Sequence, residues 1–253
     1  MIGSVHGHRS AAARARRVES ALQAVVVAAL LALLAAVNDL LAIDAFLDGS
    51  RSVSVLDHSE TLRLVTLWTQ FAVLAIAAGC YLHWQAQATA NLGALGLPSG
   101  RWTARSAAAS WVTPGVNLVQ PKRVTDDLWR SGDPAAPTRT AAVDVTGLPV
   151  AMRVHLWWAL WIGAWIVGLA GGLATDRESL DSSRAGDILD GAADVLIIAG
   201  AVMTSALVHR ITERQDARAA ALAQRMAVGL ASGLGTPGNL PRASPQSQFV
   251  LVQ

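Results

Sequence analysis

Apolar residues gather along the chain in four long runs that are separated by polar connections. The runs cover about residues 21–41, 64–83, 154–174 and 188–208, and each is close to the roughly 20 residues that cross a bilayer as a helix. None of them contains a proline, which would interrupt a helix. A soluble helical core could contain one such run, but four with polar connections indicate a membrane protein. We therefore predict an all-α integral membrane protein whose four transmembrane helices form a bundle.

Composition supports this fold class and excludes others. The chain is 53% hydrophobic and only 15% charged, which is too apolar for a disordered protein and high for a soluble enzyme. Nine tryptophans accompany one tyrosine and three phenylalanines, and Trp is favoured where apolar and aqueous regions meet. The net charge of +2, without a basic stripe or stacking motif, argues against nucleic acid as a partner. The single cysteine, Cys80, excludes an internal disulfide.

Arg and Lys residues are distributed unevenly over the connections, and this predicts the orientation. They are frequent in the N-terminal segment, in the long connection between the second and third runs, and after the fourth run. The two short connections are acidic and contain only Arg51, Arg63, Arg177 and Arg184. Because positive charge is retained in the cytoplasm, we predict a multi-pass protein of the cell (inner/plasma) membrane with both termini cytoplasmic. The first run is of spanning length, so we expect an uncleaved anchor rather than a signal peptide.

The long connection contains a weakly apolar segment, about residues 104–130, that is too short to cross a bilayer. We expect the second helix to continue beyond the membrane to about Leu92, Pro114-Gly115 to split the segment, and Pro121 to begin a short helix. The prediction is an interfacial Trp/Pro segment on the cytoplasmic side, with a re-entrant segment as the alternative. Its residues either have an architectural role or form an interfacial or partner surface; the candidates are Trp111, Pro114, Asn117, Pro121 and Trp129.

The order of tryptophans and prolines in this region carries a resemblance. Trp84 and Asn91 are followed by Trp111-x-x-Pro114-Gly115-Val116-Asn117-Leu118-x-x-Pro121, then by Leu128-Trp129-Arg130-Ser131, then by Trp157-Trp158-x-x-Trp161. From about Leu62 to His209 the chain resembles the actinobacterial membrane-protein family called domain of unknown function 4328. The resemblance implies an architecture, and it brings no activity and no site residues.

Acidic residues lie within or beside the first and fourth runs, where ionised groups are costly and often functional. Asp39 is near the outer end of the first run, and Asp187, Asp190 and Asp194 recur at spacings of three and four on one helix face. Because Arg63 lies at the same level, the candidate polar cluster is Asp39, Arg63, Asp190 and Asp194. An ion-pair cluster, a cation site, a shallow proton site and an acidic face in water are the alternatives.

Other polar and small residues indicate packing between the helices and the extent of the membrane domain. Gln70 can form an interhelical hydrogen bond, and Gly168-x-x-x-Gly172 allows another helix to approach the third run closely. We predict a cytoplasmic N-terminal segment, a membrane domain, a largely solvated helical extension and a tail that is disordered because of its Ser, Gly, Pro and Gln content. Their bounds are 1–20, 21–209, 210–229 and 230–253.

No motif for catalysis is present in the sequence. We find no phosphate loop, nucleophile elbow or H-E-x-x-H motif, and His6, His8, His58 and His155 lack the neighbours of a metal site. We expect no enzyme, no catalytic residue, no metal and no cofactor; the expected partners are the lipid bilayer and a possible protein at the cytoplasmic face. The favoured function is a non-enzymatic scaffold or interaction protein. The alternative is a small transporter, channel or intramembrane sensor using Asp39 and Asp194, which requires Asp194 to face Asp39 or Gln70.

Overall fold

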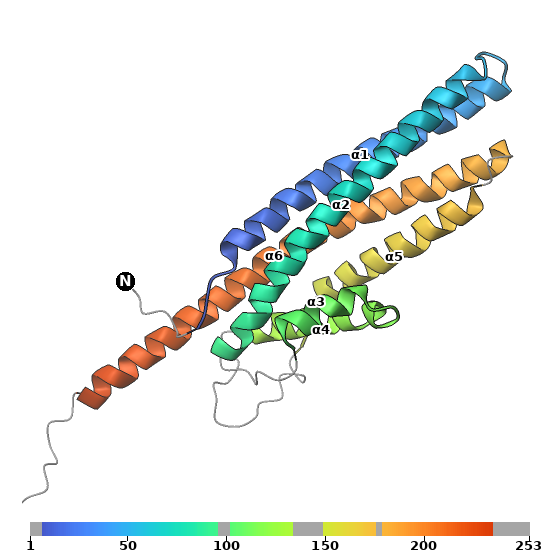
Figure 1. Cartoon of the computed structure of the whole chain (residues 1–253). Helices are drawn as coiled ribbons and strands as arrows, with labels where there is room; N and C mark the ends of the chain where they lie inside the picture. The colour runs from blue at the N-terminus through green and yellow to red at the C-terminus, as the bar shows by residue number, and fades with distance from the viewer. Residues whose placement is uncertain (1–6, 96–101, 134–148, 176–178, 235–253) are drawn as a thin grey trace, which may run out of the picture.

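The computed structural model of the chain describes residues 7–95, 102–133, 149–175 and 179–234. The elements in these parts are all helical (Figure 1): α1 (Ala12–Leu47), α2 (Ser54–Ala94), α3 (Ala104–Val112), the 3-10 helix η1 (Val116–Leu118), α4 (Gln120–Ser131), α5 (Met152–Ala174) and α6 (Leu180–Leu234). Four of them, α1, α2, α5 and α6, are long and apolar enough to cross a membrane. The predicted all-α class and the four candidate spans are thus confirmed.

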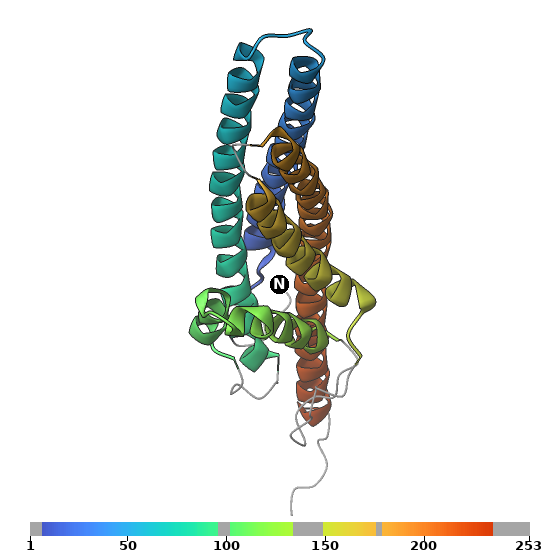
Figure 2. The same cartoon turned by 90° about the vertical axis from the view of Figure 1, so that its right-hand side faces the viewer.

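The four long helices run side by side, and the short ones lie across one end of them (Figure 2). Helix α1 packs along both α2 and α6, and α5 packs along the other side of α6. Helices α3 and α4 connect α2 with α5 and α6. We call the end where α3, η1 and α4 lie the platform end. The opposite end, where α1 leads into α2 and α5 leads into α6, is the hairpin end.

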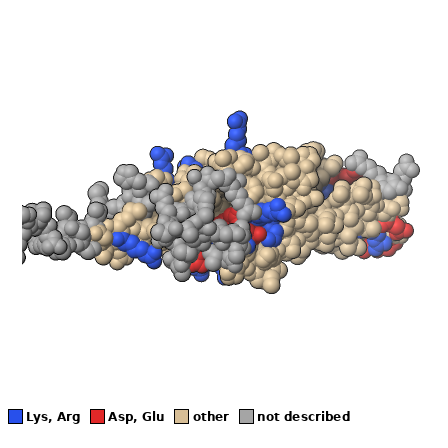
Figure 3. Space-filling view, turned by 90° about the horizontal axis from the view of Figure 1, so that it is seen from below, with Lys and Arg blue, Asp and Glu red and all other residues tan. Residues whose placement is uncertain are grey.

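Large apolar side chains of the long helices point away from the bundle, and small ones pack inside it. In α1 the buried residues include Ala28, Ala29, Ala35 and Ala36, whereas other residues of that helix expose large apolar side chains. On other helices, Trp68 is 69% exposed and Leu173 is 78% exposed. Figure 3 shows the resulting uncharged band between a platform end rich in Lys and Arg and a hairpin end with Asp and Glu. An apolar surface of this extent is typical of lipid contact.

Several helices extend beyond the predicted spans because their flanking residues favour helix and contain no proline. Helix α2 continues to Ala94, as its sequence predicts. Helix α1 begins at Ala12, inside the segment 1–20 that was expected to precede the membrane domain. Helix α6 is continuous to Leu234, so the predicted tail cannot begin at residue 230. The rest of that tail lies outside the described residues.

Aromatic residues fill the bundle where the platform meets the long helices. Trp84 of α2 and Trp157 of α5 are each 1% exposed, and Tyr81 lies between them with ring centroids 5.4 and 6.4 Å away. Trp111 of α3 packs edge-on against Tyr81 at 5.4 Å and against Trp158 at 6.1 Å. These contacts hold the platform against the long helices.

Candidate functional site

Arg63 of α2 gathers carboxylates from two other helices near the hairpin end. Its Nη1 pairs with Asp39 Oδ2 of α1 at 3.5 Å and with Asp187 of α6, and its Nη2 pairs with Asp190 Oδ2 at 2.7 Å. Ser59 Oγ donates a hydrogen bond to Asp39. We call Asp39, Arg63, Asp187, Asp190 and Asp194 the carboxylate cluster. Of the predicted polar cluster, Asp39, Arg63 and Asp190 are thus in contact, together with Asp187.

Asp194 lies one helical turn further into the bundle than Asp190, about 6 Å along α6. Its Oδ1 accepts a hydrogen bond of 2.6 Å from Gln70 Nε2 of α2. Asp194 is 6% exposed and Gln70 is 5% exposed, so both side chains are inside the bundle. The contact between Asp194 and Gln70 is one of the two, with Asp39 or with Gln70, that a transporter, channel or sensor is expected to require.

Asp187 is the member of the cluster that sequence reasoning did not include. It is 1% exposed, and within the described parts of the chain its Oδ2 has no hydrogen-bond partner. The spacing of Asp187, Asp190 and Asp194 places all three on one helix face, and this spacing is the sequence signal that identifies Asp187 as a member. Of the alternatives for this face of α6, an acidic face in water does not describe Asp187, because α1 and Arg63 cover it.

A glycine of α5 makes room for the cluster. A Cβ atom at Gly171 would lie 2.4 Å from Asp190 Oδ1 and 3.3 Å from the Asp190 nitrogen, so only glycine fits without displacement. Gly168 also faces α6, where its Cβ would meet Ala193 at 3.6 Å, whereas nothing lies within 4 Å of Gly172. The predicted close approach thus occurs within the bundle, but it uses Gly168 and Gly171. The prediction for Gly172 is wrong because that residue points away from α6.

At the platform end, the predicted surface residues divide into two groups. Pro121 and Trp129 are buried, which agrees with the architectural alternative and not with an exposed partner surface. The Trp129 ring lies between two guanidinium groups, with Arg153 at 5.4 Å and Arg214 at 4.5 Å from its centroid. Half-buried Trp111 donates from Nε1 to Gln85 Oε1 over 3.0 Å. Trp111 and Trp129 thus hold the platform against the long helices.

Pro114 and Asn117 lie in the turn between α3 and α4, where Gly115 has a φ of 75° that favours glycine. The backbone N–H of Asn117 donates to Thr113 O over 3.0 Å. Its side chain forms no hydrogen bond with any described residue. Around the turn, exposed apolar side chains form what we call the apolar tip: Val112, Leu118 and Val119.

Polar side chains near the platform end of α6 bond to neutral partners on other helices. Trp84 Nε1 of α2 donates to Thr212 Oγ1 over 2.9 Å, and Gln215 Nε2 donates to Ala88 O over 3.1 Å. Arg218, only 2% exposed, donates from Nε to Leu95 O over 3.2 Å. Burial lowers the pKa of the Arg218 guanidinium. The predicted solvated extension is therefore wrong for its first part, which packs on α2, while residues 224–229 are exposed.

A family model described as "Domain of unknown function (DUF4328)" matches residues 47–213, about two thirds of the chain. The chain belongs to this family. The predicted resemblance is confirmed, and the match extends beyond both ends of the predicted region. Comparison with curated proteins and with solved structures finds no match.

The DUF4328 match covers α2 to the middle of α6 and excludes almost all of α1. It therefore contains Arg63, Asp187, Asp190 and Asp194, as well as the platform. Asp39 comes from outside the matched region, on the helix that packs between α2 and α6. Within the described parts of the chain, no group of three or more His, Cys, Asp or Glu residues has the arrangement of a metal site.

Proposed function

We propose that this protein is a non-enzymatic, multi-pass membrane sensor whose carboxylate cluster responds to protons. The observation that carries this proposal is the imbalance of charge around Arg63. One guanidinium contacts Asp39, Asp187 and Asp190, and a fourth carboxylate, Asp194, is bonded only to the neutral amide of Gln70 among the described residues. Isolated ionised groups are costly away from water. Carboxyl groups packed this closely cannot all ionise, so binding of a proton by some of them lowers the number of charges and hence the cost.

The position of the cluster supports a sensor more than a channel or transporter. Beyond Asp194 toward the platform, the large aromatic side chains of Tyr81, Trp84 and Trp157 fill the interior. Helix α6 runs without interruption from Asp187 to the residues that bond the platform end of α2. A change in the charge of the cluster that moves α6 would therefore reach the platform.

The distribution of Arg and Lys supports an orientation with the hairpin end outside the cell membrane and both termini in the cytoplasm. The lipid bilayer is then one partner, and the apolar tip would lie in the cytoplasmic interface. A single cysteine can test this orientation in a Cys80→Ala background. We expect Ser52→Cys to react with an impermeant thiol reagent in intact cells and Ala227→Cys to react only after permeabilisation. The opposite pattern would contradict the orientation.

A scaffold that binds a cytoplasmic protein is the second candidate function. It is supported by apolar residues on the exposed part of α6, where Met226 is 56% and Val228 is 62% exposed. A scaffold has no need of the carboxylate cluster, so the two functions differ in their dependence on pH. Nothing in either proposal requires catalysis or nucleic acid.

The sensor proposal is tested by a pH titration of the purified protein in nanodiscs. We expect the infrared carboxyl band to grow between neutral and mildly acidic pH, and the tryptophan fluorescence of the platform to change with it. The variant carrying Asp187→Asn and Asp194→Asn should lose both changes. Asp57→Asn, which alters an exposed carboxylate on α2, should retain them. A wild-type protein with no pH response, or a response that survives in the double variant, would refute the sensor.

A further inference from the structure

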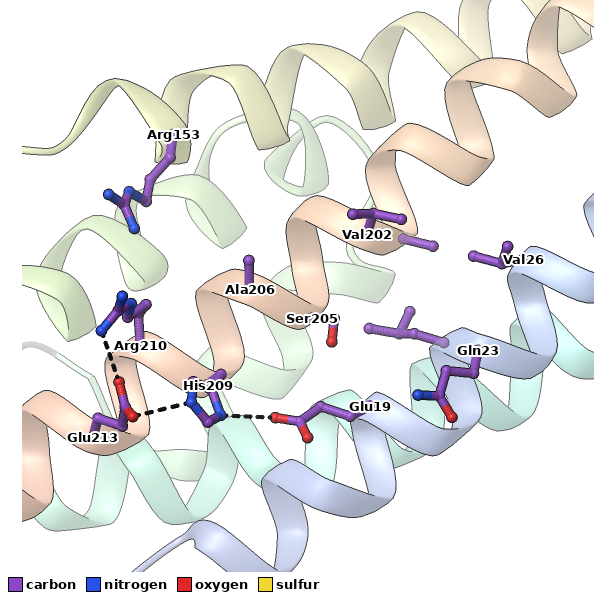
Figure 4. Close-up of a pocket in the computed structure, with 12 residues that line it drawn as sticks. Glu19, Gln23, Val26, Arg153, Val202, Ser205, Ala206, His209, Arg210 and Glu213 are labelled. Atoms are coloured by element: carbon purple, nitrogen blue, oxygen red, sulfur yellow. Dashed lines mark hydrogen bonds and ion pairs between the residues drawn. The ribbon is translucent and has the colours of Figure 1, made fainter.

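A groove of about 690 Å³ lies over α6, away from both the carboxylate cluster and the aromatic core (Figure 4). Residues 19–26 of α1 form one wall, Arg153 of α5 stands on the other side, and residues 201–213 of α6 form the floor. Neither the sensor nor the scaffold uses this groove.

The groove changes from apolar to charged along the helix axes. Helices α1 and α6 run in opposite directions, so Val26 lies near Val202, and Glu19 lies near His209 (Figure 4). Val202 is 59% exposed and belongs to the apolar band. Arg153 directly precedes the apolar run of α5, so the charged half lies at the edge of this band. A phospholipid changes from chain to headgroup at the same level.

The charged half of the groove contains two carboxylates, Glu19 and Glu213, and two guanidinium groups, Arg153 and Arg210. Their charges balance when His209 is neutral. His209 Nδ1 is 3.3 Å from Glu19 Oε1, and its Nε2 is 3.0 Å from Glu213 Oε1. Arg210 Nη1 pairs with the other Glu213 oxygen at 3.1 Å. In this chain of contacts Glu19 uses one carboxylate oxygen and has only a histidine as its partner.

Arg153 supplies the cationic side. No carboxylate of the described residues lies within ion-pair distance of it. Its guanidinium lies 5.4 Å from the centroid of the Trp129 ring and points from α5 toward Arg210 (Figure 4). It belongs to the first turn of α5, which has no side-chain cap on its N–H groups. The N–H groups of this first turn and the helix dipole add positive potential at this point. Both features favour an anion such as a phosphate.

We propose that this groove binds a phospholipid whose zwitterionic headgroup carries a primary ammonium, as in phosphatidylethanolamine. Arg153 binds the phosphate, Glu19 accepts hydrogen bonds from the ammonium, and an acyl chain lies along Val26 and Val202. Charge complementarity selects this class of lipid. An anionic headgroup without an ammonium would leave Glu19 and Glu213 beside a phosphate, and a quaternary headgroup has no N–H to donate.

The test uses the full-length protein and native mass spectrometry after exchange into mixed micelles of one lipid at a time. We expect phosphatidylethanolamine to be retained more strongly than phosphatidylcholine or phosphatidylglycerol. Arg153→Ala and Glu19→Gln should each weaken its retention about tenfold, as expected for the loss of one charge-assisted hydrogen bond. Arg17→Ala on another face of α1 and Glu60→Gln at the hairpin end are matched controls and should bind as the wild type does.

Three results would overturn the proposal. These are equal retention of the three lipids, preferential retention of phosphatidylglycerol, and unchanged binding in both groove variants. Arg17, Glu60 and Arg153 are exposed and Glu19 is half-buried, so the variants should fold, although Arg153→Ala also removes the guanidinium from the Trp129 ring. The thermal unfolding temperature of each variant without added lipid verifies this.

Discussion

At its hairpin end, α6 presents three carboxylates to one guanidinium and one amide. At its platform end the same helix presents Thr204, Thr212 and Gln215, which bond to indole N–H groups and a backbone carbonyl. Both sets of contacts are buried, but only the set at the hairpin end is made by ionised groups. The contrast sharpens the proposal: protons would act on the carboxylates at the hairpin end, whereas the three neutral contacts of Thr204, Thr212 and Gln215 form in the same way at any pH.

The largest expected effect comes from removing the cation of the carboxylate cluster. Arg63→Gln leaves Asp39, Asp187 and Asp190 without their shared partner, and we expect a loss of about 3 kcal/mol in the free energy of unfolding in detergent at neutral pH. Protonation of the carboxylates should reduce the loss in acid. Thermal or denaturant unfolding measures it, and Arg184→Gln, which breaks an exposed pair with Asp44, should cost less than about 1 kcal/mol.

A second substitution distinguishes a balance of charge from simple packing around Arg63. Adding Asp187→Asn to Arg63→Gln removes one of the uncompensated carboxylates, so the double variant should be more stable than Arg63→Gln alone. If the double variant is instead less stable, by the sum of the two single losses, the comparison between the two ends of α6 fails.

Close packing of α5 beside the cluster predicts an intermediate effect. Gly171→Ala places a methyl group 2.4 Å from Asp190 Oδ1 and 3.3 Å from the backbone of α6. We expect a loss of about 2 kcal/mol, because the carboxylate and α5 must both shift. Gly172→Ala is the matched control, since nothing lies within 4 Å of that position, and it should change stability by less than about 0.5 kcal/mol. Equal effects of the two substitutions would show that Gly171 does not position Asp190.

The neutral contacts of α6 toward the platform end predict a smaller loss in the free energy of unfolding, and this loss should be independent of pH. Thr204 Oγ1 accepts hydrogen bonds from Trp157 Nε1 over 2.9 Å and from Trp161 Nε1 over 3.0 Å. Thr204→Val removes the acceptor for both, and we expect a loss of about 1 kcal/mol, in line with hydrogen bonds between membrane helices. Thr204→Ser should retain most of the stability. A loss that varies between neutral and mildly acidic pH would contradict the difference between the two ends.

The sequence predicts the helices better than it predicts which side chains meet. Length and apolarity identify the four spans, and the spacing of Asp190 and Asp194 identifies the acidic face. The partners of that face come from α1 and α2, at sequence separations that no local pattern reports: Arg63 lies 127 residues before Asp190. The same limitation explains Arg218, whose charge suggested exposure, although its burial depends on carbonyl groups of Leu95 and Asp133.

The two glycines of α5 and the tryptophans of the platform illustrate a further limit. Gly168 and Gly172 satisfy a spacing typical of close helix packing, but the crossing of α5 over α6 selects Gly171. Trp129 is of a residue type favoured at membrane interfaces. It is buried nevertheless, with Arg153 and Arg214 of other helices on its ring. In both cases the residue type was informative, and the direction of the side chain required the fold.

The smallest expected effect concerns Asp48, an exposed carboxylate in the turn between α1 and α2. Hydrogen bonds from the side chain and the backbone of Ser50 hold the pKa of Asp48 below its ordinary value of 3.8. A lowered pKa in the folded state contributes stability above the unfolded value, and this contribution is lost as the pH falls through the folded pKa. Ser50→Ala should therefore raise the pKa of Asp48 toward 3.8, which an NMR titration in micelles can measure. The pH response of the platform fluorescence should stay unchanged in this variant. A shift of that response would assign it to the exposed turn instead of the carboxylate cluster.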